Sequence, residues 1–348
     1  MNEVTDMNDI KSMTMEEMEE MILSMGEKKF RAGQIYKWLH KELADDYDAM
    51  SDLSKKLREE LAAARPLYGV REIRRLESAK DGTVKYLFAL HDDNVIESVL
   101  MRYKHGNSVC ISSQVGCNMG CKFCASTVDG CVRSLTPSEM LSQVYAIQKD
   151  CGERISNVVV MGSGEPLDNY EALLRFIKMI TDENGLNISQ RNITVSTCGL
   201  VPKIRTLAKE KLQITLAISL HAPNDEKRKA LMPVAKVYSI DELMEACRFY
   251  FDSTGRRVTF EYALVAGNND GEEDAMQLCA LLKGMGAHVN LIPVNPVTES
   301  GMKRPEMKNC ERFRDRLIKG HVNATIRREL GSDVNAACGQ LRRSHLNN

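Results

Sequence analysis

The sequence predicts an α/β fold built on a parallel sheet. Six short β-rich runs occur after residue 103, and helical stretches separate nearly all of them. Strands that alternate with helices form parallel sheets joined by right-handed crossovers. The length of 348 residues is enough for about two domains, or for one large barrel with an appendage.

The residues before this series follow two other patterns. Apolar residues recur at helical spacing from Met15 to about Leu61, which predicts a small helical module. Residues 84–101 alternate between apolar and polar around the turn HDDN, which predicts a β-hairpin. We therefore divide the chain into a helical domain (1–68), a hairpin extension or linker (69–104), a main α/β domain (105–341) and a tail (342–348).

The main domain is defined by its six predicted strands. Capping boxes that begin at Thr136 and Ser239 mark the starts of two of its helices. Periodicity alone does not separate an open doubly wound sheet from a partial barrel, but in both folds ligands bind at the carboxyl ends of the strands. The predicted strands are SVCIS (108–112), NVVVMG (157–162), NITVST (192–197), ITLAISL (214–220), VTFEYAL (258–264) and HVNLIPV (288–294).

Composition excludes several classes of protein. Hydrophobic residues make up 43% and charged residues 27% of the chain, and no apolar run approaches the roughly 18 residues of a membrane span. The net charge of -1 means that any site for a polyanion must be local. The cysteine count is eleven, an odd number, and the acidic N-terminus lacks the apolar core of a signal peptide. We therefore expect a cytoplasmic protein whose grouped cysteines serve metal or redox chemistry.

Three cysteines lie close together directly after the first predicted strand. Cys117, Cys121 and Cys124 form the pattern C-x3-C-x2-C, and Gly116 and Gly120 allow the backbone to turn between them. Three thiolates on one loop can hold three irons of a 4Fe-4S cluster. The fourth iron then remains open to chelate the amino and carboxylate groups of a substrate.

The three cysteines also fit two roles that involve no iron–sulfur cluster. They could be buried together by chance, or they could belong to a structural zinc site, which needs four ligands. The candidates for a fourth zinc ligand are His105, Cys110 and Cys131.

The segment VCISSQVGCNMGCKFC resembles the signature of the radical S-adenosylmethionine (SAM) superfamily. With MGSGEPLDN, STCGLVP, AISLHAPND, VNLIPVNP and DVNAACGQL in this order, the chain resembles the RlmN/Cfr family of RNA adenine methyltransferases from about Phe30 to Leu341. The resemblance implies a partial TIM-type (βα)6 radical SAM barrel at 105–341. It also implies that the small helical domain at 1–68 is an accessory domain that binds RNA.

The resemblance further implies a radical mechanism with two SAM molecules per turnover. Adenine C2 is electron-poor, so it does not attack the SAM methyl group as a nucleophile would. One SAM methylates a cysteine, and the other, cleaved at the 4Fe-4S cluster, gives a 5′-deoxyadenosyl radical. By motif match, Cys338 in a C-terminal loop carries the methyl group, Cys110 releases the product by forming a disulfide, and Glu97 is the general base. Without the family, Glu97 in an alternating strand is expected to face solvent.

The family also implies the residues that bind SAM. Gly164 and Glu165 follow the second predicted strand, where a glycine permits close approach of a ligand and a carboxylate suits the SAM ammonium group. A histidine such as His221 is, on its own, more often a satisfied core residue. The other matching positions at strand ends are Ser196, Ser219, Leu220 and Asn295.

The expected product is 2-methyladenosine. Val115 and Pro166 resemble the branch that methylates adenine C2, whereas the C8 branch, which confers antibiotic resistance, tends to have cysteine and alanine there. The implied partners are 23S rRNA at the peptidyl transferase centre, tRNA at the adenine 3′ to the anticodon, and an external low-potential electron donor of flavodoxin or ferredoxin type; no membrane is expected. The alternatives are a C8 methyltransferase, a radical SAM enzyme for a small molecule or protein, and a zinc-dependent RNA-binding protein without enzymatic activity.

Overall fold

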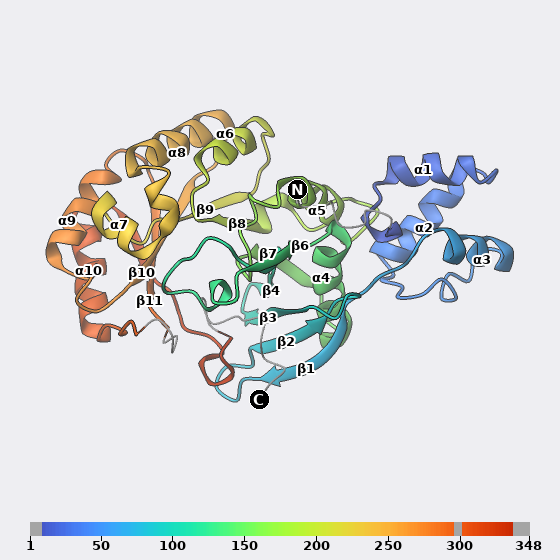
Figure 1. The fold of residues 1–348 in the computed structure, drawn as a ribbon, viewed down its shortest axis with the longest axis horizontal. Coiled ribbons are helices and arrows are strands. Elements are labelled where there is room, and N and C mark those ends of the chain that lie inside the picture. Colours follow the sequence, from blue (N-terminus) through green and yellow to red (C-terminus); the bar gives the residue numbers. More distant parts are fainter. Residues whose placement is uncertain (1–8, 296–300, 337–348) are drawn as a thin grey trace.

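One mixed sheet of ten strands forms the centre of the molecule (Figure 1). The computed structural model describes residues 9–295 and 301–336. The first four strands of the sheet pair antiparallel, and from the fourth onward all neighbours are parallel. In spatial order the strands are β1 (Arg71–Glu77), β2 (Val84–Ala89), β3 (Val95–Tyr103), β4 (Gly106–Ile111), β7 (Ile155–Val160), β8 (Ile193–Thr197), β9 (Thr215–Ser219), β10 (Val258–Leu264), β11 (His288–Pro293) and β12 (Asn323–Ile326).

The predicted α/β class is confirmed. All six predicted strands are present, from β4 to β11, and the hairpin predicted at 84–101 is the β2–β3 pair. Within the described residues the edge strands β1 and β12 do not pair with each other, so the sheet stays open and forms no closed barrel. Two strands of this sheet were not predicted: β12 has only four residues, and β1 is a mostly exposed, highly charged segment without a clear apolar face.

Helices run around the outside of the curved sheet (Figure 1). Both predicted capping boxes are confirmed: the Thr136 hydroxyl accepts from the Glu139 amide and the Glu139 carboxylate accepts from the Thr136 amide, and Ser239 and Glu242 pair in the same way. The helices are α4 (Pro137–Cys151), α5 (Tyr170–Ile180), α6 (Val201–Lys209), α7 (Asp225–Leu231), α8 (Ile240–Thr254), α9 (Glu272–Leu281) and α10 (Met307–Lys319), with short 3-10 turns η2 (Ala125–Thr127), η3 (Gln190–Asn192), η4 (Pro233–Lys236) and η5 (Ser332–Val334).

The predicted helical module is also present, as a lobe beside α4 and α5 (Figure 1). It packs on the main domain through a shared apolar core and through a hydrogen bond of 2.9 Å between His40 Nδ1 and the Tyr145 hydroxyl. Its last helix begins only at Lys55, because Ser54 caps it there. The elements are η1 (Ile10–Ser12), α1 (Met15–Ser24), α2 (Phe30–His40) and α3 (Lys55–Ala64).

A second, two-stranded sheet encloses the cysteine loop. Its strands are β5 (Gln114–Gly116) and β6 (Cys131–Ser134), which pair antiparallel. Among residues 9–295 and 301–336, no helix has both the length and the apolar character needed to span a bilayer.

Candidate functional site

The loop between β5 and β6 carries all three motif cysteines. The two strands approach closely at Gly116, which has φ +78°, and a Cβ there would collide with the Gly130 carbonyl oxygen. The Cys117 amide donates to the same carbonyl at 3.0 Å, which closes the loop. Only glycine allows this combination of positive φ and close backbone approach. The sequence therefore needs Gly116 to hold Cys117, Cys121 and Cys124 on one compact loop.

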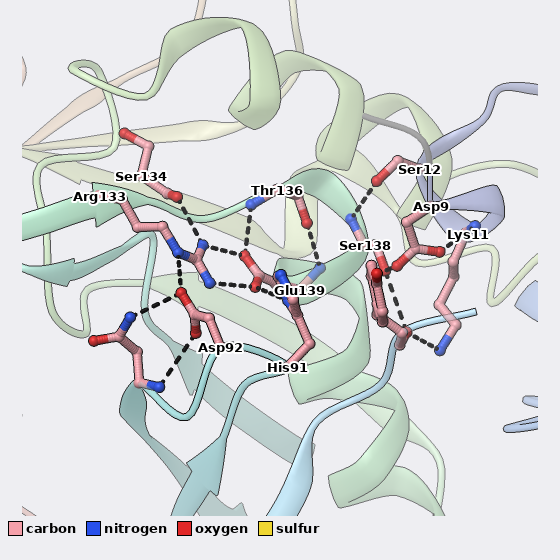
Figure 2. Close-up of polar contacts among 12 residues, drawn as sticks. Asp9, Lys11, Ser12, His91, Asp92, Arg133, Ser134, Thr136, Ser138 and Glu139 are labelled. Atoms are coloured by element: carbon pink, nitrogen blue, oxygen red, sulfur yellow. Dashed lines mark hydrogen bonds and ion pairs between the residues drawn. The ribbon is translucent and has the colours of Figure 1, made fainter. Parts of the chain in front are cut away.

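Arg133 on β6 anchors the end of this loop. Its guanidinium forms two hydrogen bonds with the Glu139 carboxylate, at 2.8 and 2.7 Å, and one with Asp92 at 2.7 Å (Figure 2). Glu139 belongs to the first turn of α4, and Asp92 lies in the turn between β2 and β3. A bidentate arginine–carboxylate pair restricts orientation as well as distance. The loop is thereby fixed both to α4 of the main domain and to the turn of the β2–β3 hairpin.

The three thiols fit an iron–sulfur cluster. Cys117 and Cys121 are buried, and Met119 and Phe123 pack around Cys121 and Cys124. Burial raises the pKa of Cys117 to about 12 and also raises the pKa of Cys121, so free thiolates are disfavoured unless a cationic centre compensates them. Within the described residues no three His, Cys, Asp or Glu side chains gather around one point as a single metal ion requires. A 4Fe-4S cluster has no such requirement, because each thiolate binds a different iron.

The cysteine loop faces an open cavity at the carboxyl ends of the parallel strands, with a volume of about 940 Å³ when its solvent-open part is included. Leu220 is fully buried and does not line the cavity. All the other predicted SAM-binding residues line it together with the three cysteines: Gly164, Glu165, Ser196, Ser219, His221 and Asn295.

Glu165 is held in one orientation by the backbone. One carboxylate oxygen accepts from the Cys198 amide at 2.7 Å and the other from the Leu167 amide at 3.0 Å. Burial raises the pKa of Glu165 and outweighs these hydrogen bonds. Gly164 next to it has φ +108°, and a Cβ there would lie 2.7 Å from Gln114 atoms. A buried carboxylate of this kind favours a cationic ligand group such as an ammonium.

His221 links the cysteine loop to the end of β9. Its Nδ1 accepts from the Ala263 amide at 2.8 Å, and its ring packs edge-to-face on Phe123 with centroids 4.6 Å apart. Burial lowers the pKa of His221 to about 3, so the ring is neutral. The residue is therefore both a satisfied core histidine and part of the cavity wall.

Two charged residues, Glu261 and Arg327, also line the cavity; Glu261 was not singled out from the sequence, and Arg327 belongs to a basic C-terminal stretch that the sequence offers only for contact with RNA. Glu261 is buried in the middle of β10, accepts from Asn290 at 2.9 Å and lies 4.0 Å from Arg327. Burial raises the pKa of Glu261, while Arg327 and Asn290 act in the opposite direction. The sequence does contain a signal for Glu261, since it is an acidic residue inside the otherwise apolar run VTFEYAL. A charged residue in a buried strand needs a partner, and this marks Glu261 as a candidate functional residue.

The solvent-facing position expected for Glu97 from alternation alone is wrong. The side chain is completely buried on β3, and Lys85 Nζ on β2 forms an ion pair with Glu97 Oε1 at 2.7 Å. The first seven residues of β3 are buried on both faces of the strand, so alternation in the sequence does not identify a solvent-exposed face there. Lys85 itself was not singled out from the sequence.

Cys110 lies one strand further along the sheet. It is opposite Val99 in the β3–β4 pair, and Val99 is two residues from Glu97 on β3, so all three share one face. Val99, Cys110 and Ala336 belong to one apolar cluster, against which Met161 from the cavity wall also packs. Cys338 lies outside the described residues, two positions after Ala336.

Comparisons with known families agree with this arrangement. Residues 111–279 match the model of the radical SAM superfamily. Residues 8–65 match the model of the ribosomal RNA large subunit methyltransferase N-terminal domain.

Individual relatives match almost the whole chain. "Probable dual-specificity RNA methyltransferase RlmN" of Lachnospira eligens is 58% identical over 98% of this chain and 97% of its own length. The protein of the same name from Alkaliphilus oremlandii is 56% identical over 98% and 99%. Among solved structures, a radical SAM methyltransferase from Sphaerobacter thermophilus superposes with a TM-score of 0.92 at 45% identity, covering 96% of this chain and 98% of that one.

Proposed function

Because this chain belongs to the RlmN family of radical SAM RNA methyltransferases, we propose that it methylates C2 of an adenine in 23S rRNA and of the adenine 3′ to the anticodon in tRNA. The observation that carries the proposal is the single cavity shared by three loop cysteines and the polar residues at the strand ends. Membership of the family establishes a SAM-dependent RNA methyltransferase with a 4Fe-4S cluster. The description of the relatives as dual-specificity enzymes supports two RNA substrates.

Cys117, Cys121 and Cys124 would hold three irons of the cluster. The cluster and SAM supply, when bound, the electron and the 5′-deoxyadenosyl radical that removes hydrogen from a methyl group. Glu165 suits the ammonium group of SAM, because its buried carboxylate is oriented by two amides. Ser196, Ser219, His221 and Asn295 complete the proposed SAM site, and Leu220 would act only through its backbone or through packing, since its side chain does not reach the cavity.

We assign the remaining steps to three residues on one side of this cavity. Cys338 carries the methyl group as a thioether. Glu97 accepts the proton that leaves C2 after the methylene radical has added, and the one electron that is lost with it would return to the oxidised 4Fe-4S cluster. The Cys110 thiol then attacks the sulfur of Cys338: the bond from that sulfur to the methylene carbon breaks, this carbon takes up a proton, and the methylated base is released while a disulfide forms between the two cysteines. The apolar contact group that contains Cys110 and Ala336 supports this pairing, because Ala336 is only two residues before Cys338 in the chain. An external donor of flavodoxin or ferredoxin type would supply the reducing electrons.

RNA binding is assigned to the helical domain at 1–68 together with basic residues of the main domain. Lys28 and Lys29 are exposed at the start of α2, next to Phe30, whose side chain is 57% exposed. Cations neutralise phosphates and an exposed ring can stack on an unpaired base. The match to the ribosomal RNA methyltransferase N-terminal model supports this division.

The decisive experiment is mass spectrometry of RNA from a strain that lacks the gene. We expect 2-methyladenosine to disappear from both 23S rRNA and tRNA and to return when the gene is restored. Loss of 8-methyladenosine instead would assign the C8 reaction. In vitro, each methyl group transferred should give one S-adenosylhomocysteine and one 5′-deoxyadenosine, since two SAM molecules are used.

The cluster is tested separately from the methylation. Protein purified without oxygen should contain about four irons and four sulfides per chain, and Cys117→Ala should lose them. Cys151→Ala is the matched control, because Cys151 lies at the end of α4, away from the loop. Stoichiometric zinc in place of iron would contradict the proposal and favour the zinc-dependent RNA-binding protein.

A further inference from the structure

The ion pair between Lys85 and Glu97 is the most deeply buried one among the described residues. The side chains are 1% and 0% exposed, whereas in the other ion pairs at least one partner keeps more contact with solvent, as Arg133 does with 13%. An ammonium group and a carboxylate are costly to bury, and the burial is tolerated only when each has partners. A buried lysine in a strand therefore suggests a role beyond stability, because a well-packed apolar pair would be at least as stable.

The same ammonium group reaches the C-terminal segment. Lys85 Nζ donates to the Asn335 carbonyl at 3.2 Å, across 250 residues of sequence. Asn335 is three positions before Cys338 and has φ +50°. The segment turns back on itself there, since the Ala336 amide donates to the Gly331 carbonyl at 3.0 Å. Asparagine is one of the few residues besides glycine that adopt a positive φ at little cost, so the residue present suits this turn.

Sheet register explains why one lysine can serve both partners. Lys85 on β2 is paired with Val99 on β3, and Val99 is paired with Cys110 on β4, so the three side chains form a row on one face. Glu97 lies two residues from Val99 on the same face, diagonal to Lys85. Ala336 packs over this row in the apolar cluster with Val99 and Cys110.

We propose that Lys85 is a positioning residue for methylation. Its ammonium group contacts both the Glu97 carboxylate and the backbone that leads to Cys338, and it thereby keeps the base at a constant distance from the methyl carrier. The inference rests on the roles proposed above for Glu97 and Cys338. A general base must lie within about 3 Å of the proton that it removes, and the substrate carbon is attached to the methyl carrier at that moment. The distance between base and carrier therefore decides the rate, and Lys85 contacts both sides.

The test uses the full-length protein with its cluster and compares Lys85→Met, Glu97→Gln and the double variant. Methionine keeps the length of the lysine stem and glutamine keeps the shape of the carboxylate. We expect Lys85→Met to lower the single-turnover methylation rate by about 100-fold, while the KM for RNA stays unchanged. The double variant should be no slower than Glu97→Gln alone, because residues that act as a unit are not additive.

Hydrogen exchange gives a second readout that needs no turnover. We expect faster exchange of residues 331–336 in Lys85→Met and in the double variant, but not in Glu97→Gln, because only the first two lose the donor to Asn335. If Lys85→Met alone fails to fold because Glu97 is left unpaired, the double variant, which has neither charge, still tests this point against Glu97→Gln. The matched control is Lys178→Met, which removes an ammonium from an exposed ion pair with Glu16 and should leave rate and exchange unchanged.

Three results would overturn the role of Lys85: a wild-type rate in Lys85→Met, multiplied losses in the double variant, or unchanged exchange at 331–336. A result that contradicts the proposed function can be distinguished from a result that contradicts the role of Lys85. In the first case the wild-type protein makes no 2-methyladenosine, while the exchange measurement still reports whether Lys85 holds the segment.

Discussion

The two ends of the described chain are both attached to the main domain, but by contacts of opposite character. At the N-terminal end, Asp9, Lys11 and Ser12 are almost completely buried against α4. The Ser138 hydroxyl donates to Asp9 at 2.5 Å, and the Ser138 amide donates to Ser12 at 3.1 Å (Figure 2). Lys11 Nζ donates in turn to the Tyr68 carbonyl at 3.1 Å.

At the C-terminal end the polar contacts are exposed or only partly buried. Asp333 accepts from the Ser78 hydroxyl at 2.6 Å and from the Ala79 amide at 3.1 Å, and Lys80 donates to Ser332 at 3.1 Å. Exposed polar contacts are weak because water replaces them readily, whereas buried polar groups must stay paired. The comparison indicates that the helical domain is docked more firmly than segment 331–336, whose partly buried contacts are those of Gly331 with Asp81, of Asp333 with Ser78, of Asn335 with Lys85 and of Ala336 with the apolar cluster. Such a segment suits a residue that changes partners, as proposed for Cys338.

We expect the largest effect from a substitution that breaks the N-terminal attachment. Asp9→Ala should lower the free energy of unfolding by about 2–3 kcal/mol, because it leaves the Ser138 hydroxyl and the Lys11 amide buried without their acceptor. Urea denaturation measures this change. Asp252→Ala on the exposed side of α8 is the control, with an expected change within about 0.5 kcal/mol. Equal stability of the two variants would contradict the comparison.

We expect a smaller loss of stability when Ser138, the other partner of the hydrogen bond with Asp9, is replaced. Ser138→Ala should lower the free energy of unfolding by about 1 kcal/mol, because Asp9 keeps its hydrogen bond from the Lys11 amide. The double variant with Asp9→Ala should lose less than the sum of the two single changes, since both act on one interaction. Full additivity in urea denaturation would show that the two residues stabilise the fold independently.

At the C-terminal end the same kind of change should leave global stability intact. Asp333→Ala removes one partly buried and one exposed hydrogen bond at the edge of the fold, so we expect little change in the urea midpoint and faster hydrogen exchange confined to residues 331–336. A loss of global stability as large as that of Asp9→Ala would show that this segment is part of the cooperative core.

The smallest expected effect is one of pH, and its sign differs between the two ends. Burial raises the pKa of Asp9 above its usual 3.8. Its contribution to stability is therefore complete below about pH 3.8 and decreases as the pH rises through the folded-state pKa. The hydrogen bond from Ser78 lowers the pKa of Asp333, so its contribution is present above about pH 3.8 and is lost as the pH falls through the folded-state pKa.

Acidification from about pH 5 to pH 3 should thus loosen residues 331–336 before residues 9–12. Hydrogen exchange corrected for its intrinsic pH dependence measures both segments in one experiment. Asp333→Asn should weaken the acid response of the C-terminal segment alone, and the remainder should come from Asp81, which accepts from the Gly331 amide at 3.0 Å. Earlier opening of residues 9–12 would reverse the order that we expect.

Local patterns were sufficient for most of the fold. The capping box of Thr136 and Glu139 depends on residues three apart, and the hairpin of β2 and β3 depends on alternation around a short turn, so both are visible in the sequence. The strand β12 was missed because its four residues alternate between exposed and buried like many loops. Its place in the sheet comes from pairing with β11, whose partner residues lie far away in the chain.

The candidate site also has one part that the sequence could predict and one part that it could not. Cys117, Cys121 and Cys124 were predictable as a group because they occupy one loop, and the strand-end positions were predictable because parallel strands end at a common edge. The burial of Glu97 was not predictable. Alternation identifies the two faces of a strand, but it does not say whether another part of the chain covers the outer one.

The sequence by itself determined the order of strands and helices, the cysteine loop and the family that its motifs resemble, because each depends on residues close together or on spacing along the chain. Only the tertiary structure decided that Lys85 and Glu97 are both buried as an ion pair and that Lys85 also contacts Asn335. The physical reason is that a contact across 250 residues depends on how the chain folds back against the sheet after its last strand. Local propensity carries no information about such long-range packing.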